Sequence, residues 1–360
     1  MPPHPATQEI DTHGSKPRQC AAAPLAWIAL VVILGILLLG DSTAARSGGL
    51  ISFLPHPAKD AQALQKQTVP SRNAAALTTN RFDIEYVEPT DPAHRPLYAL
   101  LQQEHVLEKV QALLAPVKLP IRITLKLGSC DGVANATFWD DVIKVCYEYI
   151  DYVLKHASKV ATDALPLRDV MIGPTIEVFL HEAGHAVVEV LDIPFFGREE
   201  DVADYFATYI LLQLCKDDAR RLILGTSFVG GAEAIDEQGK RPDLHLLADT
   251  HSLPAQRYFN RWCMAYGANP VLFADAVDNG LLPQSRAKHC RYEYQTNAFA
   301  FRTLISPYID EKLKQKVFAK NWFASPAMDR PMCATTISMA ISQEINCKTL
   351  LDEGLCTKQR

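Results

Sequence analysis

The feature that most constrains this chain is a His-Glu-x-x-His pattern inside a long apolar stretch. His181 and His185 lie four residues apart, so on a helix they share one face and can reach a single point. A tetrahedral zinc ion takes two imidazole ligands in this way. Glu182 follows His181, where its carboxylate can take a proton from a metal-bound water.

The residues around this pattern are predicted to form two helices. Apolar residues recur at helical spacing through residues 176–191, which favours a largely buried helix with Pro174 in its first turn. After a short break that contains Pro and Gly, a second helix is expected to begin near Arg198 and to pack antiparallel to the first. Gly184 costs about 1 kcal/mol in a helix interior relative to Ala, which indicates that another segment or a substrate passes close by.

A third metal ligand is expected from the start of the second helix. The candidates are Glu199, Glu200, Asp201 and Asp204, and we predict Glu200. Glu200 and Asp204 share one helical face, so one carboxylate can bind zinc while the other holds a ligand histidine by its second ring nitrogen. Acidic residues also favour a helix N-terminus, which accounts for Glu199 and Asp201 but not for Asp204, a full turn further in.

This combination, H-E-x-x-H followed by E-x-x-A-D-x-F-A, resembles the gluzincin metallopeptidases of the thermolysin and prenyl-protein-peptidase kinds. The resemblance implies that His181, His185 and Glu200 hold one zinc ion, Zn(2+), per chain. It also implies that Glu182 is the general base and that Asp204 holds a ligand histidine by the ring nitrogen that does not bind the metal. The longer run with GREEDVAD and HSLPAQRYFN is similar to an uncharacterised bacterial family described as putative metallopeptidases, over Arg81 to Ile309.

A stretch before the helices, residues 135–146, reads as two short strands around Asp140 and Asp141. Thermolysin-like enzymes carry a similar Asn-Ala-aromatic stretch on the edge strand beside the active site. An edge strand offers free backbone groups to an extended peptide. The resemblance therefore implies that Asn135 and Ala136 contact the substrate main chain, whereas the alternative is an ordinary hairpin with a polar turn.

Two residues further along are candidates for stabilising the oxyanion that forms when water attacks a carbonyl: His251, with Arg257 as the second choice. An isolated histidine carries little weight without geometry, so capping or packing is the alternative for His251. Arg257 has the alternative of pairing with an acidic side chain. Between the two regions, three glycines are expected in a loop: Gly225, Gly230 and Gly231.

The chain divides by composition into five parts. We expect a polar cytoplasmic segment, a charge-free apolar span, a linker rich in small and polar residues, a metallopeptidase domain and a cysteine-containing tail packed on it, at 1–20, 21–40, 41–80, 81–325 and 326–360. About 20 apolar residues can span a bilayer, so the second part predicts a membrane anchor, with a cleaved signal peptide as the alternative. The domain would then be attached to the inner membrane and face the periplasm or exterior, or be secreted after cleavage.

Eight of the nine cysteines follow the apolar span, which suggests disulfides in an oxidising compartment. Cys130 and Cys146 flank the hairpin-like segment and are the best local pair, and Cys263–Cys290 is a weaker one. No tight C-x-x-C pair is present, which disfavours cysteine ligands for the metal.

Together, the residues and the resemblance predict an α+β, zincin-like fold: a small mixed sheet with an antiparallel edge strand, packed on the active-site helices. The expected activity is zinc-dependent hydrolysis of a peptide or protein substrate. A zinc hydrolase of a non-peptide amide or ester, a catalytically silent zincin-fold envelope protein and a structural zinc site are the alternatives, although intact Glu182 argues against a silent protein. The net charge of −5 argues against a nucleic-acid partner.

Overall fold

The computed structural model describes residues 76–162, 165–236 and 244–323. The predicted N-terminal segment, apolar span, most of the linker and the tail therefore lie outside the described residues. Backbone pairing begins slightly before the expected domain start at residue 81, because the Thr78 N–H donates to the Leu119 carbonyl at 3.2 Å.

No helix within these three ranges combines the length and the apolar character needed to cross a membrane. This finding goes against the predicted single-pass anchor, against the membrane as a partner and against the localisation derived from them. We correct those predictions accordingly. The span on which they rested, residues 21–40, is itself outside the described residues.

The sheet has four strands in the order β1-β2-β4-β3. Three of them run parallel, with buried partners such as Leu125 and Ile143 directly opposite each other, and β3 pairs antiparallel with β4. The strands are β1 (Phe82–Tyr86), β2 (Ile123–Gly128), β3 (Ala136–Trp139) and β4 (Val142–Cys146). The prediction of a mixed α+β fold with a small mixed sheet is thus confirmed.

The β3–β4 connection is a two-residue turn in which Asp140 and Asp141 have φ angles of 50° and 62°. Two positive φ values in succession match the right-handed twist of a hairpin, and aspartate tolerates them better than most residues. The predicted disulfide Cys130–Cys146 is present and ties the segment before β3 to the end of β4. The Glu148 carboxylate accepts hydrogen bonds from the backbone N–H of Cys130, so this segment is held at two points.

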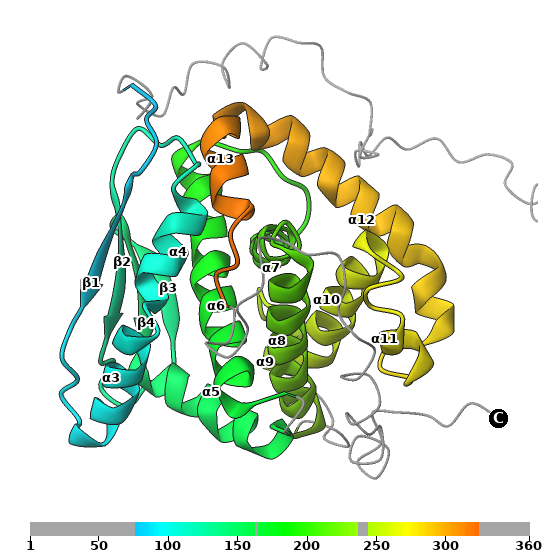
Figure 1. The fold of residues 1–360 in the computed structure, drawn as a ribbon, viewed down its shortest axis with the longest axis horizontal. Coiled ribbons are helices and arrows are strands. Elements are labelled where there is room, and N and C mark those ends of the chain that lie inside the picture. Colours follow the sequence, from blue (N-terminus) through cyan, green and yellow to red (C-terminus); the bar gives the residue numbers. More distant parts are fainter. Residues whose placement is uncertain (1–75, 163–164, 237–243, 324–360) are drawn as a thin grey trace, which may run out of the picture. The chain divides into compact units, whose positions relative to one another are not determined.

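Helices make up most of the described chain (Figure 1). In Figure 1 the sheet lies at one side, α10 and α12 lie at the other, and α6, α7 and α8 fill the space between. The helices are η2 (Pro92–His94), α3 (Arg95–Gln103), α4 (Val106–Leu114), α5 (Tyr147–Val160), α6 (Leu167–Val190), α7 (Glu199–Leu211), α8 (Lys216–Asp236), α9 (Leu244–Ala248), α10 (Pro254–Ala268), α11 (Asp275–Asp278), α12 (Gln284–Leu304), η3 (Ser306–Tyr308) and α13 (Glu311–Phe318).

The helix that carries the histidine pattern, α6, is the centre of the core. Of its 24 residues 20 are buried, and it contacts β3, β4, α4, α5, α7 and α8. It begins at Leu167, so the prediction that Pro174 lies in the first turn is wrong. A proline inside a helix removes one backbone hydrogen bond, and for this reason a proline in a sequence is usually read as a helix boundary. In α6 the packing of the helix on all sides outweighs the cost of that lost hydrogen bond. At the first turn, Arg168 donates to Glu104, the residue that follows α3.

The following helix, α7, runs antiparallel to α6, as expected from the short loop. His181 contacts Asp204 while His185, one turn later on α6, contacts Glu199, one turn earlier on α7. The two helices meet closely at Gly184, where a Cβ atom would lie 2.9 Å from the Ala203 Cα atom. The prediction that another segment passes close to this glycine is therefore confirmed.

The glycines expected in a loop lie instead inside α8. A Cβ atom on Gly225 would lie 2.7 Å from the Asp169 carbonyl oxygen of α6, and one on Gly231 would lie 3.1 Å from the Tyr258 ring of α10. These glycines allow helices to cross closely, and that use overrides their tendency to break helices.

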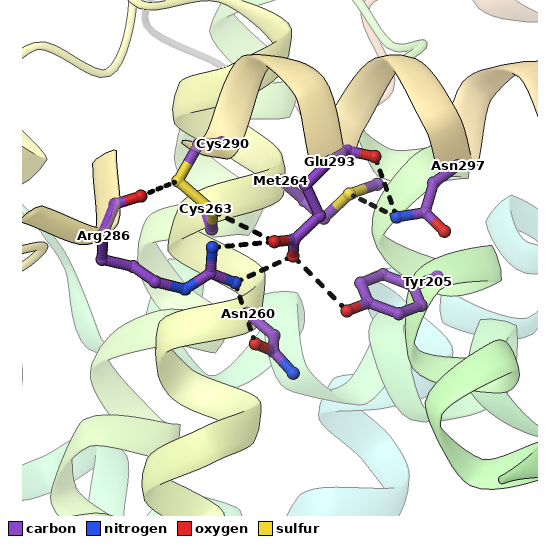
Figure 2. Close-up of a disulfide and its surroundings, with 8 residues drawn as sticks. All are labelled: Tyr205, Asn260, Cys263, Met264, Arg286, Cys290, Glu293 and Asn297. Carbon is purple, nitrogen blue, oxygen red and sulfur yellow. Dashed lines mark hydrogen bonds and ion pairs between the residues drawn. A yellow bond between two sulfur atoms is a disulfide. The ribbon is translucent and has the colours of Figure 1, made fainter. Parts of the chain in front are cut away.

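The second predicted disulfide, Cys263–Cys290, joins α10 to α12 (Figure 2). Glu293, one turn after Cys290, accepts hydrogen bonds from Arg286 of the same helix and from Tyr205 of α7. The disulfide joins α10 to α12, and the hydrogen bond between Glu293 and Tyr205 joins α12 to α7. Both connections help to fix the position of α10, which matters for the site because α10 carries Arg257.

Candidate metal centre

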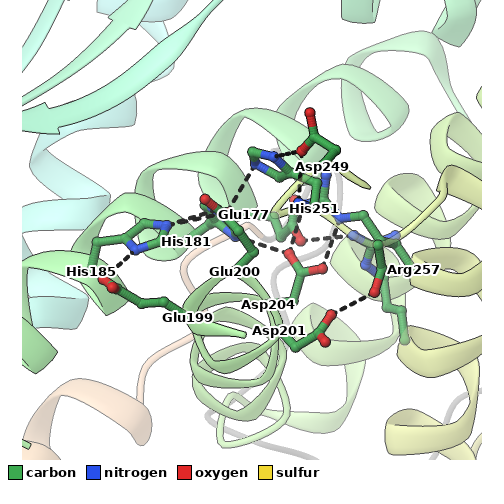
Figure 3. A network of polar contacts seen from close by, with 12 residues as sticks. Glu177, His181, His185, Glu199, Glu200, Asp201, Asp204, Asp249, His251 and Arg257 are labelled. Carbon is green, nitrogen blue, oxygen red and sulfur yellow. Dashed lines mark hydrogen bonds and ion pairs between the residues drawn. The ribbon is translucent and has the colours of Figure 1, made fainter. Parts of the chain in front are cut away.

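The structure brings the three predicted metal ligands together at the α6–α7 interface (Figure 3). The His181 Nε2 atom lies 3.3 Å from the His185 Nε2 atom and 3.1 Å from the Glu200 Oε2 atom. The third side of the triangle, from His185 Nε2 to Glu200 Oε2, measures 3.3 Å.

These three distances fit a tetrahedral ion of zinc's size. Zinc binds imidazole nitrogen and carboxylate oxygen at about 2.0–2.2 Å, so two ligand atoms at the tetrahedral angle are separated by about 3.3 Å. All three measured edges, from 3.1 to 3.3 Å, are close to that value. A single ion could therefore be equidistant from His181, His185 and Glu200 without movement of the helices.

Carboxylates fix the other ring nitrogen of both histidines. The His181 Nδ1 atom lies 2.9 Å from Asp204 Oδ1, and the His185 Nδ1 atom lies 2.8 Å from Glu199 Oε1. Such partners orient a ligand imidazole and select the tautomer that leaves Nε2 free for a metal. Asp204 was predicted to hold a ligand histidine, and the structure places it against His181. The contact of Glu199 with His185 was not predicted, because the position of Glu199 at the helix start already had a sufficient explanation.

The electrostatics of the site favour a cation. Burial opposes protonation of His181, but hydrogen bonds with Asp204 and Glu200 raise its pKa to about 10. Burial likewise opposes ionisation of Glu200, yet three imidazoles, those of His181, His185 and His251, hold its pKa far below the usual range. Strong proton binding shows that the electrostatic potential at the site is negative. A divalent cation can replace the protons and be stabilised by the same potential.

Glu182 is buried beside these groups, with 7% of its surface exposed. Burial raises the pKa of its carboxyl group, and its nearest charged neighbours include His181, His185, Glu200 and His251. The side chain therefore belongs to the same cluster of charges, in an environment that makes a carboxylate a better proton acceptor.

His251 faces the same point from the segment between α9 and α10. Its Nε2 atom lies 2.9 Å from Glu200 Oε2, and its Nδ1 atom lies 3.0 Å from Asp249 Oδ1. The ring stacks on His181 at 6.3 Å, and the ligand atoms of His181, Glu200 and His251 lie within 4.8 Å of one another. His181 and Glu200 are thus close to two further imidazoles, and the Nε2 atom of His185 completes the near-equilateral triangle described above.

Arg257 reaches the ligand histidines through Asp204, whereas Asn135 and Ala136 lie at the edge of the sheet. Arg257 donates from Nε and Nη2 to both oxygens of Asp204, at 2.7 and 2.6 Å, which is the acid-pairing alternative. Ala136 is the first residue of the edge strand β3, which contacts α6, and Asn135 directly precedes it. In the described part of the chain, no hydrogen bond or ion pair joins either residue to His181 or Glu200.

Comparison with known proteins identifies one family. A family model described as "Putative metallopeptidase" matches residues 86–305, more than half of the chain and almost all of the region expected from the resemblance. No curated protein and no solved structure matches the chain. The matched region includes the three ligand candidates, Glu182 and His251.

Proposed function

Because the chain belongs to the family described as "Putative metallopeptidase", we propose that it is a zinc-dependent metallopeptidase that hydrolyses peptide bonds. The observation that carries this proposal is the triangle of His181 Nε2, His185 Nε2 and Glu200 Oε2, with edges of 3.1 to 3.3 Å. Three protein ligands leave one tetrahedral position for water, as catalytic rather than structural zinc sites do.

We also propose that the domain, residues 81–325, has the zincin-like arrangement of the gluzincins. Two observations support this: the histidine helix α6 packs directly on β3, and β3 is an antiparallel edge strand whose described partner is β4 alone. An extended peptide could pair with the open side of β3, where Asn135 and Ala136 would meet its main chain.

In the proposed mechanism, bound zinc supplies a Lewis acid for the scissile carbonyl and a lowered pKa for a water molecule. Glu182 takes the proton from that water and delivers it to the leaving amine. The His251 Nε2 atom lies 2.9 Å from Glu200 Oε2, so in the substrate complex its N–H would be near the reacting carbonyl and could donate to the oxyanion, while Asp249 contacts the opposite ring nitrogen. Arg257, which is bound to Asp204, positions His181 through that carboxylate rather than touching the substrate.

The test is the variant Glu182→Gln in the full chain, compared by zinc content and by digestion of a peptide library with and without a chelator. We expect unchanged zinc content and a loss of hydrolysis of about 100-fold or more, since general-base catalysis contributes at least that much. Glu189→Gln is the matched control, because Glu189 is exposed on the same helix. Full activity of the Glu182 variant would exclude Glu182 as the base.

A further inference from the structure

A cleft of about 280 Å³ opens between α6, α8 and α10, next to the metal centre. Its wall begins at His251 and continues inward to Glu177 of α6, Glu233 of α8 and Arg261 of α10. A cleft of this size is at the lower end of ligand sites, with room for one long side chain rather than a whole folded ligand.

The cleft continues the α6 face that carries the ligand histidines. Glu177 lies four residues before His181, so it is one helical turn away on the same face. Figure 3 shows Glu177 within the same polar cluster as His181, His251 and Arg257. A substrate whose scissile carbonyl lies between His181 and His251 would therefore have a neighbouring side chain at the mouth of this cleft.

The charges that line the cleft do not balance. Both guanidinium groups already have carboxylate partners: Arg257 binds Asp204, and Arg261 Nη2 donates to Glu177 Oε1 at 2.8 Å. Glu233 has neither an ion pair nor a hydrogen bond with any residue that the structure describes. Burial raises the pKa of Glu233 against the opposing influence of Arg257 and Arg261. The cleft thus contains a carboxyl group that has no bound cation, and a cation placed beside it would stabilise its ionised form.

We infer that this cleft binds a lysine or arginine side chain of the substrate, next to the scissile bond, with the Glu233 carboxylate as its ion partner. The inference rests on the proposed function, since it assigns the substrate class of the same site. An acidic side chain is disfavoured because three carboxyl groups, those of Glu177, Glu233 and Asp249, line the cleft against two guanidinium groups. Leaving one member of a buried charge pair without its partner is costly, which makes the preference measurable.

The first experiment uses zinc-loaded full-length protein and peptides that differ only beside the cleaved bond, with Lys, Arg, Leu or Glu there. We expect kcat/KM to be at least about tenfold higher for Lys or Arg than for Leu, and lower still for Glu. Glu233→Gln should remove the preference while cleavage of the Leu peptide persists. Glu311→Gln, which removes one carboxylate from α13 far from the cleft lining, should retain the preference.

A second measurement separates this inference from the proposed activity. Fluorescent peptides are titrated into the Glu182→Gln protein, with and without Glu233→Gln, so that affinity is read without turnover. Tighter binding of the Lys peptide that disappears with Glu233→Gln supports the inference whether or not hydrolysis is found. Equal affinity for Lys and Leu peptides, or a Lys preference that survives Glu233→Gln, overturns it, even if the wild-type protein cleaves both peptides.

Discussion

The close approach of α6 and α7 at Gly184 provides a sharp test of how the ligand triangle is set. A Cβ atom at this position would lie 2.9 Å from Ala203 Cα, whereas ordinary contact begins at 3.4 Å, so the substitution Gly184→Ala requires α7 to retreat by about 0.5 Å. Ala203 directly precedes Asp204 and lies three residues after Glu200. The retreat would therefore move one proposed ligand and the partner of another.

The expected effect on metal binding exceeds the effect on folding. Metal–ligand distances tolerate errors of about 0.2 Å, and disturbing the groups that orient the ligands typically costs 10–100-fold in affinity. Overpacking costs about 1–3 kcal/mol, but replacing a helical glycine by alanine returns about 1 kcal/mol. We therefore expect Gly184→Ala to weaken zinc binding by about 10–100-fold, with a net loss in the free energy of unfolding of only about 0–2 kcal/mol.

Competition with a chromophoric chelator measures zinc affinity, and urea unfolding of the metal-free protein measures stability. Gly128→Ala is the matched control, because its added Cβ atom would meet nothing closer than the end of the Lys144 side chain, at 3.4 Å. If Gly184→Ala bound zinc as tightly as the wild-type protein, the spacing of α6 and α7 would not determine the site.

Two further predictions concern the third ligand and an ion pair outside the site. Glu200→Ala should lower zinc occupancy far more than Asp201→Ala, as measured by metal analysis; equal occupancy would remove Glu200 as a ligand. The hydrogen bond from Arg168 lowers the pKa of Glu104, so its stabilisation is complete above the unfolded-state pKa and disappears as pH falls through the folded-state pKa. Glu104→Gln should thus cost about 1–2 kcal/mol at pH 7 and progressively less below about pH 4 in urea unfolding, whereas a constant difference would contradict this account.

The convergence of the proposed ligands could be predicted from the sequence because their spacing is local. His181 and His185 share a helical face, and a short loop returns Glu200 and Asp204 to them, so no long-range contact had to be guessed. The β3–β4 hairpin and its Cys130–Cys146 disulfide were predictable for the same reason.

The partners of His251 and Arg257 could not be predicted in this way. About fifty residues separate each from the α7 carboxylate it contacts, and nothing in the sequence marks which of many acids is the partner. The extent of helix α8 could not be predicted either, because glycine disfavours a helix locally. The glycines of α8 stabilise the fold only through the close packing they allow against α6 and α10. Where tertiary packing overrides local preference, sequence patterns give the wrong boundary.

The near-complete burial of α6 also determines which parts of the protein can respond to a substrate. Segments that open independently of the whole fold are those with few buried contacts, and α6 is the opposite case. A reactive centre built on this helix would keep its geometry as long as the domain stays folded. Adaptation to different peptides must then come from the periphery: the free edge of β3 and the half-exposed turn that carries His251.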